Sequence, residues 1–265
     1  MLLTVDVGNT NIHLGVFAGL GDHAKLVHDW RIHTDPHYTA DELAMSIRGL
    51  LGSDVEQVTA VAGLSTVPSL TREMRVMVGK HFGNGPHALL EPGVRTGVPL
   101  LVDNPKEVGA DRVANALAAH GRFGGPAIVV AFGTATVVDA VSARGEFLGG
   151  AIAPGVNLAV EALAEHTVTL RRTELRAPRS VVGKNTTEAL QSGIIYGFAG
   201  QVDALVDRMR DEVPGFDADD VHVVATGFLA PLMYDECETL TDHVSELTLD
   251  GLRRVHERGK ERRRG

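Results

Sequence analysis

The stretch LLTVDVGNTNIHLGVF, residues 2–17, decides the fold that this sequence predicts. Its apolar and β-branched residues form two short runs, and the turn-forming residues GNTN separate these runs at positions 8–11. Two such runs around a Gly/Asn turn are typical of a β-hairpin with a buried first strand. Asp6 stands near the end of the first run. The predicted hairpin therefore carries a carboxylate near its turn.

A second stretch, IVVAFGTATVVD at residues 128–139, repeats this pattern. When the two stretches are aligned without gaps, Gly133 falls on Gly8 and Ala131 falls on Asp6, at an offset of 125 residues. A period of this length is too long for a solenoid and suits a duplicated domain. The sequence thus predicts two similar halves, of which only the first has an acid at the end of its opening strand.

The pattern of apolar residues predicts an α/β succession after each hairpin. The first half reads as three strands at 2–7, 12–17 and 25–32, a helix capped by Thr39 or Asp41 that runs to 51, a strand at 58–64, a helix that begins at Pro68 or Ser69, and a strand at 87–90. The second half adds a strand at 146–152, a helix from 156, a helix at 185–209, a strand at 221–225 and a helix at 249–258. With a boundary near Leu117, we expect domains 1–117 and 118–265 that face each other across a nucleotide-binding cleft.

The composition excludes several classes of function. The chain has 34 acidic and 25 basic residues among 265, and its net charge of −9 opposes non-specific nucleic-acid binding. A single cysteine, Cys237, excludes an intrachain disulfide framework and fits a reducing compartment. Residues 1–17 lack signal-peptide features, and no apolar run approaches the roughly 20 residues of a membrane span. We expect a soluble cytoplasmic protein with a small-molecule partner and no nucleic-acid or membrane partner.

The turn after Asp6 contains the residue types of a phosphate site. Gly8 lets the backbone approach a ligand closely, and residues 9–11 offer N–H groups and polar side chains. The Asp6 carboxylate can hold a hydrated Mg²⁺, which prefers oxygen ligands. An ordinary hairpin turn uses the same residue types, so this motif alone leaves both interpretations open. The matching turn at residues 133–136 favours phosphate binding.

A second candidate segment, GADR at residues 109–112, opens a predicted helix. An Asp in a first helical turn commonly caps the helix and complements its dipole, and that structural interpretation stays open. In the functional interpretation, Asp111 takes a proton from an attacking hydroxyl and Arg112 binds a carboxylate or phosphate. Phosphoryl transfer depends mostly on positioning and charge stabilisation, so one base and one anion clamp suffice.

Five motifs in one order make the chain similar to the type III pantothenate kinases of the acetate-kinase/Hsp70/actin superfamily. They are DVGNTN at 6–11, VDNP with EVGADR at 102–105 and 107–112, FGTAT at 132–136, GGAIAPG at 149–155 and GKNT at 183–186. The resemblance implies two duplicated ribonuclease H-like domains of the actin-like ATPase type, in a homodimer. It also implies ATP-dependent phosphorylation of pantothenate to 4′-phosphopantothenate, the first step of coenzyme A biosynthesis, with Mg²⁺ and a monovalent cation, potassium or ammonium.

The same resemblance implies roles for individual residues. Asp111 is the implied catalytic base, and Asp6 holds Mg²⁺ through water. The implied ATP and phosphate site comprises Asp6, Val7, Gly8, Asn9, Thr10, Asn11, Ile12, His13, Gly133 and Thr134. The implied pantothenate site comprises Gly109, Ala110, Asp111, Arg112 and Thr186, of which Thr186 comes from the neighbouring subunit.

Three residues depart from the family pattern. Ala131 stands where the family has an Asp that binds the monovalent cation, so this ligand is missing unless a backbone carbonyl, a water or Asp139 compensates. Phe228 replaces a glycine beside the adenosine site, and Val102 stands where many members have Tyr. Ala131 affects the implied cation site, Phe228 the adenosine site and Val102 the pantothenate site.

The departure at Ala131 keeps a second class of function open, a catalytically weakened member that acts as a binding or regulatory protein. The intact Asp6, Asp111 and Arg112 oppose that interpretation. A third interpretation is another sugar or acid kinase of the superfamily. The GADR motif disfavours it, because this motif is not general to the superfamily.

Overall fold

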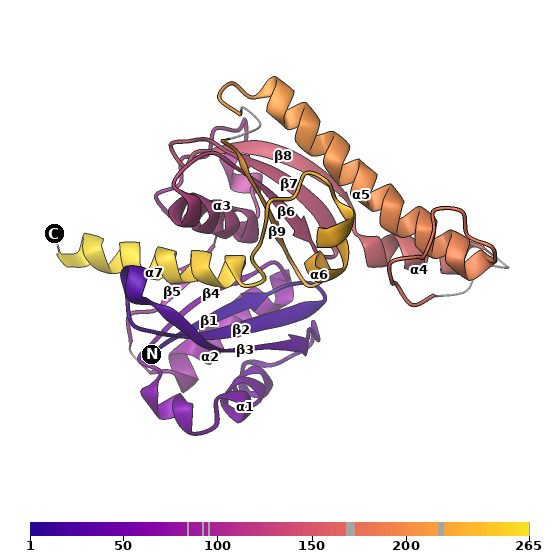
Figure 1. Cartoon of the computed structure of the whole chain (residues 1–265). Helices are drawn as coiled ribbons and strands as arrows, with labels where there is room; N and C mark the ends of the chain where they lie inside the picture. Colours follow the sequence, from indigo (N-terminus) through magenta and orange to yellow (C-terminus); the bar gives the residue numbers. More distant parts are fainter. Residues whose placement is uncertain (84, 92, 95, 168–172, 217–219, 265) are drawn as a thin grey trace. The chain divides into compact units, whose positions relative to one another are not determined.

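The computed structural model describes residues 1–83, 85–91, 93–94, 96–167, 173–216 and 220–264 (Figure 1). Contacts between residues group the chain into two compact units. The first unit consists of Met1–Val98, Asp103–Ala118 and Leu247–Gly265, and the second of Pro99–Val102 and Ala119–Glu246. In the part of the chain that is described, no helix is long and apolar enough to cross a membrane.

The first unit is built on a mixed five-stranded sheet in the order β3-β2-β1-β4-β5. β1 (Leu2–Val7), β2 (Asn11–Ala18) and β3 (Lys25–His33) are antiparallel neighbours. β4 (Ala60–Ser65) runs parallel to β1, and β5 (Ala88–Leu90) runs parallel to β4. The predicted hairpin is therefore confirmed as the centre of this sheet, and its turn lies where β1 ends.

Helices α1 (Ala40–Leu51) and α2 (Pro68–His81) cover one face of the first sheet. Leu3, Val5 and Val7 alternate along β1 and point into the core under these helices. The residues between them, among them Asp6, therefore belong to the opposite face. This alternation places the carboxylate of β1 outside the apolar core.

Helix α7 (Leu247–Arg264) lies on that opposite face (Figure 1). Gly15 of β2 leaves room for it, because Leu249 Cδ1 lies 2.8 Å from the position that a Cβ at residue 15 would take. The sequence placed residues 118–265 in one domain, whereas the contacts group α7 with the first unit. The physical reason is that α7 covers the second face of the first sheet.

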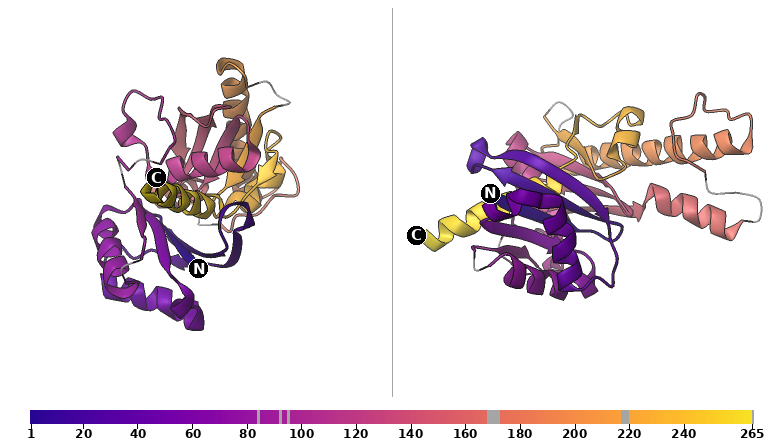
Figure 2. Two further views of the ribbon diagram at one scale, coloured as in Figure 1. Left: turned by 90° about the vertical axis from the view of Figure 1, so that its left-hand side faces the viewer. Right: turned by 90° about the horizontal axis from the view of Figure 1, so that it is seen from below.

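The second unit repeats this topology in a five-stranded sheet of the order β10-β9-β6-β7-β8. Its strands are β6 (Ala127–Phe132), β7 (Ala135–Val141), β8 (Phe147–Pro154), β9 (His222–Thr226) and β10 (Asp242–His243). Its helices are α4 (Val156–His166), α5 (Thr186–Glu212) and α6 (Ala230–Met233). Ile195 and Val202 of α5 pack against one face of this sheet. Figure 2 shows that α4 and the beginning of α5 extend beyond the edge of the sheet.

The two hairpins differ in the length of their turns. In the first, Gly8 N donates to Asn11 O at 3.0 Å, and in the second, Gly133 N donates to Ala135 O at 3.0 Å. The same closing hydrogen bond spans three residues in one turn and two in the other. The second turn is therefore one residue shorter.

The gapless alignment of the two hairpins is consequently wrong beyond the turn. It holds for β1 and β6, but the residue opposite Ala131 is Val137, as His13 is opposite Asp6. Without a gap, His13 would have been matched with Val138. The error arises because turn length is not visible in the residue types, whereas strand register is a property of the folded sheet.

Candidate active site

Two loops hold the first turn, Gly8–Asn11, and the residue before it, Val7, through their carbonyl oxygens. Thr34, which follows β3, donates its N–H to Thr10 O at 3.0 Å and its hydroxyl to Gly8 O at 2.7 Å. Thr66, which follows β4, donates its N–H and its hydroxyl to Val7 O at 2.9 and 3.2 Å. Carbonyl oxygens repel an anion, so a turn whose carbonyls bond to the protein suits phosphate.

The residues predicted to bind ATP differ in accessibility. Val7 and Ile12 are buried in the core under α1 and α2, so their side chains have no access to a ligand. His13 is 4% exposed, and its Nε2 lies 3.2 Å from Oδ2 of Asp29. The exposed or half-buried members are Asp6, Gly8, Asn9, Thr10, Asn11, Gly133 and Thr134. The accessible part of the predicted site therefore consists of Asp6 and the residues of the two turns.

Asp6 lies in a row of polar residues across the first sheet. It pairs with His13 on β2, and His13 pairs with Arg31 on β3, so all three share the face opposite α1 and α2. Burial raises the pKa of Asp6 to about 7, the Asp111 carboxylate adds to the rise, and Arg31 opposes it. Arg31 is exposed, so solvent weakens its influence.

Asp111 lies near this row, in the first turn of α3 (Ala110–Phe123). Burial raises the pKa of the Asp111 carboxyl, whereas the N–H and the guanidinium of Arg112 oppose the rise. Asp111 Oδ1 lies 2.5 Å from the position that a Cβ at Gly109 would take. A side chain at 109 would therefore displace the Asp111 carboxylate from this position.

The pair of Asp6 and Asp111 determines which cation this site suits. Each carboxyl has a raised pKa, chiefly because of burial, and a nearby cation would favour the ionised forms. Among the described residues, no group of three or more His, Cys, Asp or Glu could hold a metal. Hydrated Mg²⁺ needs only one or two carboxylates when phosphate oxygens supply the rest. The residues therefore fit magnesium that arrives with a nucleotide.

A backbone hydrogen bond also holds the second turn, Gly133–Ala135. Gly155, which follows β8, donates its N–H to Thr134 O at 3.1 Å. A Cβ at Gly155 would overlap the carbonyl oxygens of Gly133 and Thr134, so only glycine fits. Thr134 is exposed, as a contact to phosphate requires.

Ala131, where the resemblance implies a cation ligand, is half-buried near the end of β6. It pairs with Val137, which pairs with Ile152, so the row that is polar in the first unit is apolar in the second. Asp139 lies on the same face, opposite Val129, and is 3% exposed. A carboxylate is therefore present two residue pairs away from Ala131 on the same face, but not at it.

Thr186 lies in the second unit, as the first residue of α5. Asn185 caps this helix by accepting a hydrogen bond from Glu188 N at 2.9 Å, and Thr186 is exposed.

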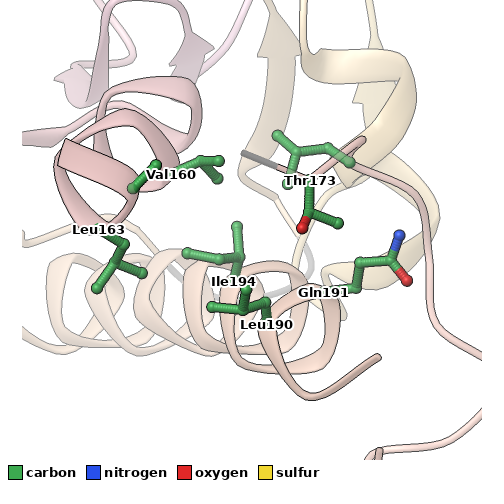
Figure 3. A pocket seen from close by; sticks show the side chains of 8 residues that line it. Val160, Leu163, Thr173, Leu190, Gln191 and Ile194 are labelled. Carbon is green, nitrogen blue, oxygen red and sulfur yellow. The ribbon is translucent and has the colours of Figure 1, made fainter. Parts of the chain in front are cut away.

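Figure 3 shows an apolar pocket between α4 and α5, lined by Val160, Leu163, Ala164, Thr173, Leu175, Leu190, Gln191 and Ile194. None of these side chains titrates near neutral pH, so this pocket does not contain the groups for proton transfer.

Sequence reasoning missed Thr34 and Thr66, and it included Gly155 only as the last residue of a motif, without a role in holding a turn. Thr34, Thr66 and Gly155 are each the first residue after a strand that neighbours a hairpin strand. Their positions at strand ends were a signal, but a usable one only once the pairing of the strands is known. In the first unit, the structure brings together the predicted turn and segment 109–112. Gly133, Thr134, Ala131 and Thr186 belong to the second unit.

Comparison with known sequences gives one family. The sequence profile of the type III pantothenate kinases matches residues 2–208. The type III pantothenate kinase of Nocardia farcinica is 64% identical over 264 residues, which cover 100% of both chains. That of Rhodococcus erythropolis is 61% identical and covers 99% of this chain and 97% of its own. That of Mycolicibacterium smegmatis is 57% identical and covers 100% of this chain and 98% of its own.

Comparison with solved structures bears on the fold alone, because the identities are low. A conserved protein of Campylobacter jejuni, assigned to the Baf family of transcriptional activators, is 16% identical with a TM-score of 0.59. It covers 98% of this chain and 99% of its own. A ROK family protein of Streptococcus pneumoniae is 12% identical with a TM-score of 0.54, and covers 98% of this chain and 99% of its own. These neighbours support the predicted ribonuclease H-like fold.

Proposed function

This chain belongs to the type III pantothenate kinase family, and from that premise we propose which of its residues carry out phosphoryl transfer. It is a kinase that phosphorylates an alcohol group of pantothenate in coenzyme A biosynthesis. The alternative of a binding or regulatory protein is not favoured, because relatives at 57–64% identity are named as kinases.

We assign the ATP phosphates to the two turns and the proton transfer to Asp111. The observation that carries this assignment is the position of Asp111 near Asp6, in the unit that contains the first turn. Asp111 accepts the proton of the pantothenate hydroxyl while that oxygen attacks the γ-phosphorus, and ADP leaves with the electrons of the broken P–O bond. The raised pKa of Asp111 makes it a stronger base than an ordinary carboxylate. The forked guanidinium of Arg112 suits the pantothenate carboxylate.

Magnesium supplies positive charge to the phosphate oxygens, and we propose that Asp6 holds it through a water molecule. The monovalent cation, potassium or ammonium, remains a prediction, since Ala131 offers no side-chain oxygen. A cytoplasmic location also remains a prediction, with the single cysteine as its support.

A coupled assay of ADP release tests this function. With ATP and Mg²⁺, we expect release that depends on pantothenate, while a panel of sugars and small hydroxy acids should give only the rate measured without acceptor. The panel is measured with and without ammonium, so that kinase activity that depends on a monovalent cation is also detected. A rate that is highest with a panel compound would show that pantothenate is not the preferred substrate.

We further propose a homodimer in which Thr186 of one chain completes the pantothenate site of the other. Just before this residue, Val181 and Val182 are 68% and 66% exposed. Ile152 on β8 of the same unit is 65% exposed. Two adjacent exposed apolar side chains close to Thr186 in the sequence suit a protein–protein interface.

Mixing two impaired variants tests this arrangement. If Thr186 acts across the interface, a heterodimer of Asp111→Asn and Thr186→Ala chains has one site built from unmutated parts. In an equal random mixture half of the dimers are heterodimers, so we expect about one quarter of the unmodified activity. Sedimentation should show a dimer at micromolar concentration. Each variant alone is the control, and absence of recovery despite proven subunit exchange would show that Thr186 serves its own chain.

A further inference from the structure

We propose that Thr34 is a positioning residue for phosphoryl transfer, whose hydroxyl directs the Gly8–Asn11 turn toward the ATP phosphates by holding the Gly8 carbonyl. This inference rests on the proposed role of that turn in binding phosphate. Thr34 belongs to none of the motifs that relate the chain to its family, and it is separated from Gly8 by 26 residues.

The geometry makes Thr34 a clamp with two points of attachment. Its N–H donates to Thr10 O at 3.0 Å and its hydroxyl donates to Gly8 O at 2.7 Å, so it holds carbonyls two residues apart. The side chain is 3% exposed, which shields the hydroxyl bond from competing water. Because each peptide group is planar, fixing a carbonyl also fixes the N–H of the next residue. The hydroxyl of Thr34 therefore sets the direction of the Asn9 N–H.

The second unit provides an internal comparison. Gly155 follows β8 as Thr34 follows β3, and its N–H donates to Thr134 O as the Thr34 N–H donates to Thr10 O. Gly155 has no side chain, yet the second unit folds with the same strand order. The backbone bond is thus the part that the fold requires. The hydroxyl of Thr34 is an addition confined to the longer first turn.

Removing the hydroxyl should therefore impair catalysis more than folding. Thr34→Val keeps the shape of the side chain but leaves Gly8 O without this donor, so the turn N–H groups lose their alignment. Misplacement of positioning groups lowers rates by up to about 10²-fold, and we expect kcat/KM for ATP to fall roughly 10- to 100-fold. The KM for pantothenate should change less than about threefold, because the turn does not bind that substrate.

The matched control is Thr4→Val. Thr4 is fully buried in β1 of the same sheet and donates its hydroxyl to Gly15 O at 3.1 Å. Its replacement removes a bond of the same kind at a place that holds no part of the turn. Both variants should lower the melting temperature to a similar degree, and only Thr34→Val should change the kinetics with ATP.

A second pair of variants decides the question even if Thr34→Val fails to fold. Ser and Cys have nearly the same size, but a thiol is a weak donor. Thr34→Ser should keep kcat/KM for ATP within about threefold of the unmodified protein, and Thr34→Cys should reproduce the loss. Equal kinetics of the Ser and Cys variants, or an effect of Thr34→Val no larger than that of Thr4→Val, would overturn the inference.

Asp6→Asn, measured in parallel, separates this inference from the proposed function. If Asp6→Asn leaves the kinetics with ATP unchanged, the turn is not the phosphate site, and both proposals fall. If Asp6→Asn is impaired while Thr34→Cys behaves like Thr34→Ser, the phosphate site stands and Thr34 is only a structural residue. If Asp6→Asn and Thr34→Cys are both impaired with ATP while Thr34→Ser is not, the phosphate site and the positioning role of Thr34 are both supported.

Discussion

Replacement of Asp111 by Asn is expected to lower kcat by about 10²- to 10⁴-fold, the range for loss of a general base. The amide has nearly the same shape as the carboxylate, so it still fits beside Gly109, but it cannot accept the proton of the hydroxyl nucleophile. The KM values for ATP and pantothenate should change little, because the substitution removes an interaction of the transition state. Steady-state kinetics and a melting curve of the variant measure both effects.

The control for this prediction is Asp41→Asn. Asp41 also lies in the first turn of a helix, α1, but it is exposed and forms ion pairs with Lys80 and His81. Its substitution should leave kcat unchanged. If Asp111→Asn lowers only the melting temperature and keeps its turnover, Asp111 is a helix cap and another group must take the proton.

Replacement of Ala131 by Asp is expected to create a strong response to ammonium or potassium. The methyl group of Ala131 offers no ligand, whereas a carboxylate supplies both oxygen and charge to a hard cation. Changes in the ligand environment of a metal typically alter its affinity by 10- to 100-fold, and we expect a gain of at least about tenfold. Turnover against ammonium concentration at fixed Mg²⁺ should rise and saturate in Ala131→Asp and stay nearly flat in the unmodified protein.

A measurement without turnover provides a second test of the same substitution. The new carboxylate would share a sheet face with Asp139, which is nearly buried, so two like charges would stand two residue pairs apart on that face. Ala131→Asp should therefore melt at a lower temperature without a monovalent cation and regain stability with one. Ala131→Asn, which lacks the charge, is the control. Saturable activation of the unmodified protein, equal to that of the Asp variant, would show that another oxygen already replaces the missing ligand.

The sequence by itself determined the features that depend on neighbouring residues. Alternation of apolar residues and the Gly/Asn turn were sufficient for the first hairpin. Thr39 and Asp41 were the two candidate caps of α1, and the structure shows that Thr39 caps it in a capping box with Glu42. Of the two predicted first residues of α2, Pro68 and Ser69, the structure confirms Pro68. Short elements such as α6 and β10 were not predicted, because four and two residues contain too little periodicity. Asp111 was singled out by its motif, but its nearness to Asp6 was not.

Only the tertiary structure decided which distant residues share the candidate site. Asp6 and Asp111 are far apart in the chain, and each acquires its raised pKa from burial that no local pattern reveals. The hydroxyl bond of Thr34 to Gly8 depends on strand pairing, which brings the end of β3 beside the turn. The shorter second turn and the placement of α7 on the first sheet were equally hidden. Local preferences depend on a few neighbouring residues, whereas register, burial and charge proximity depend on how the whole unit packs.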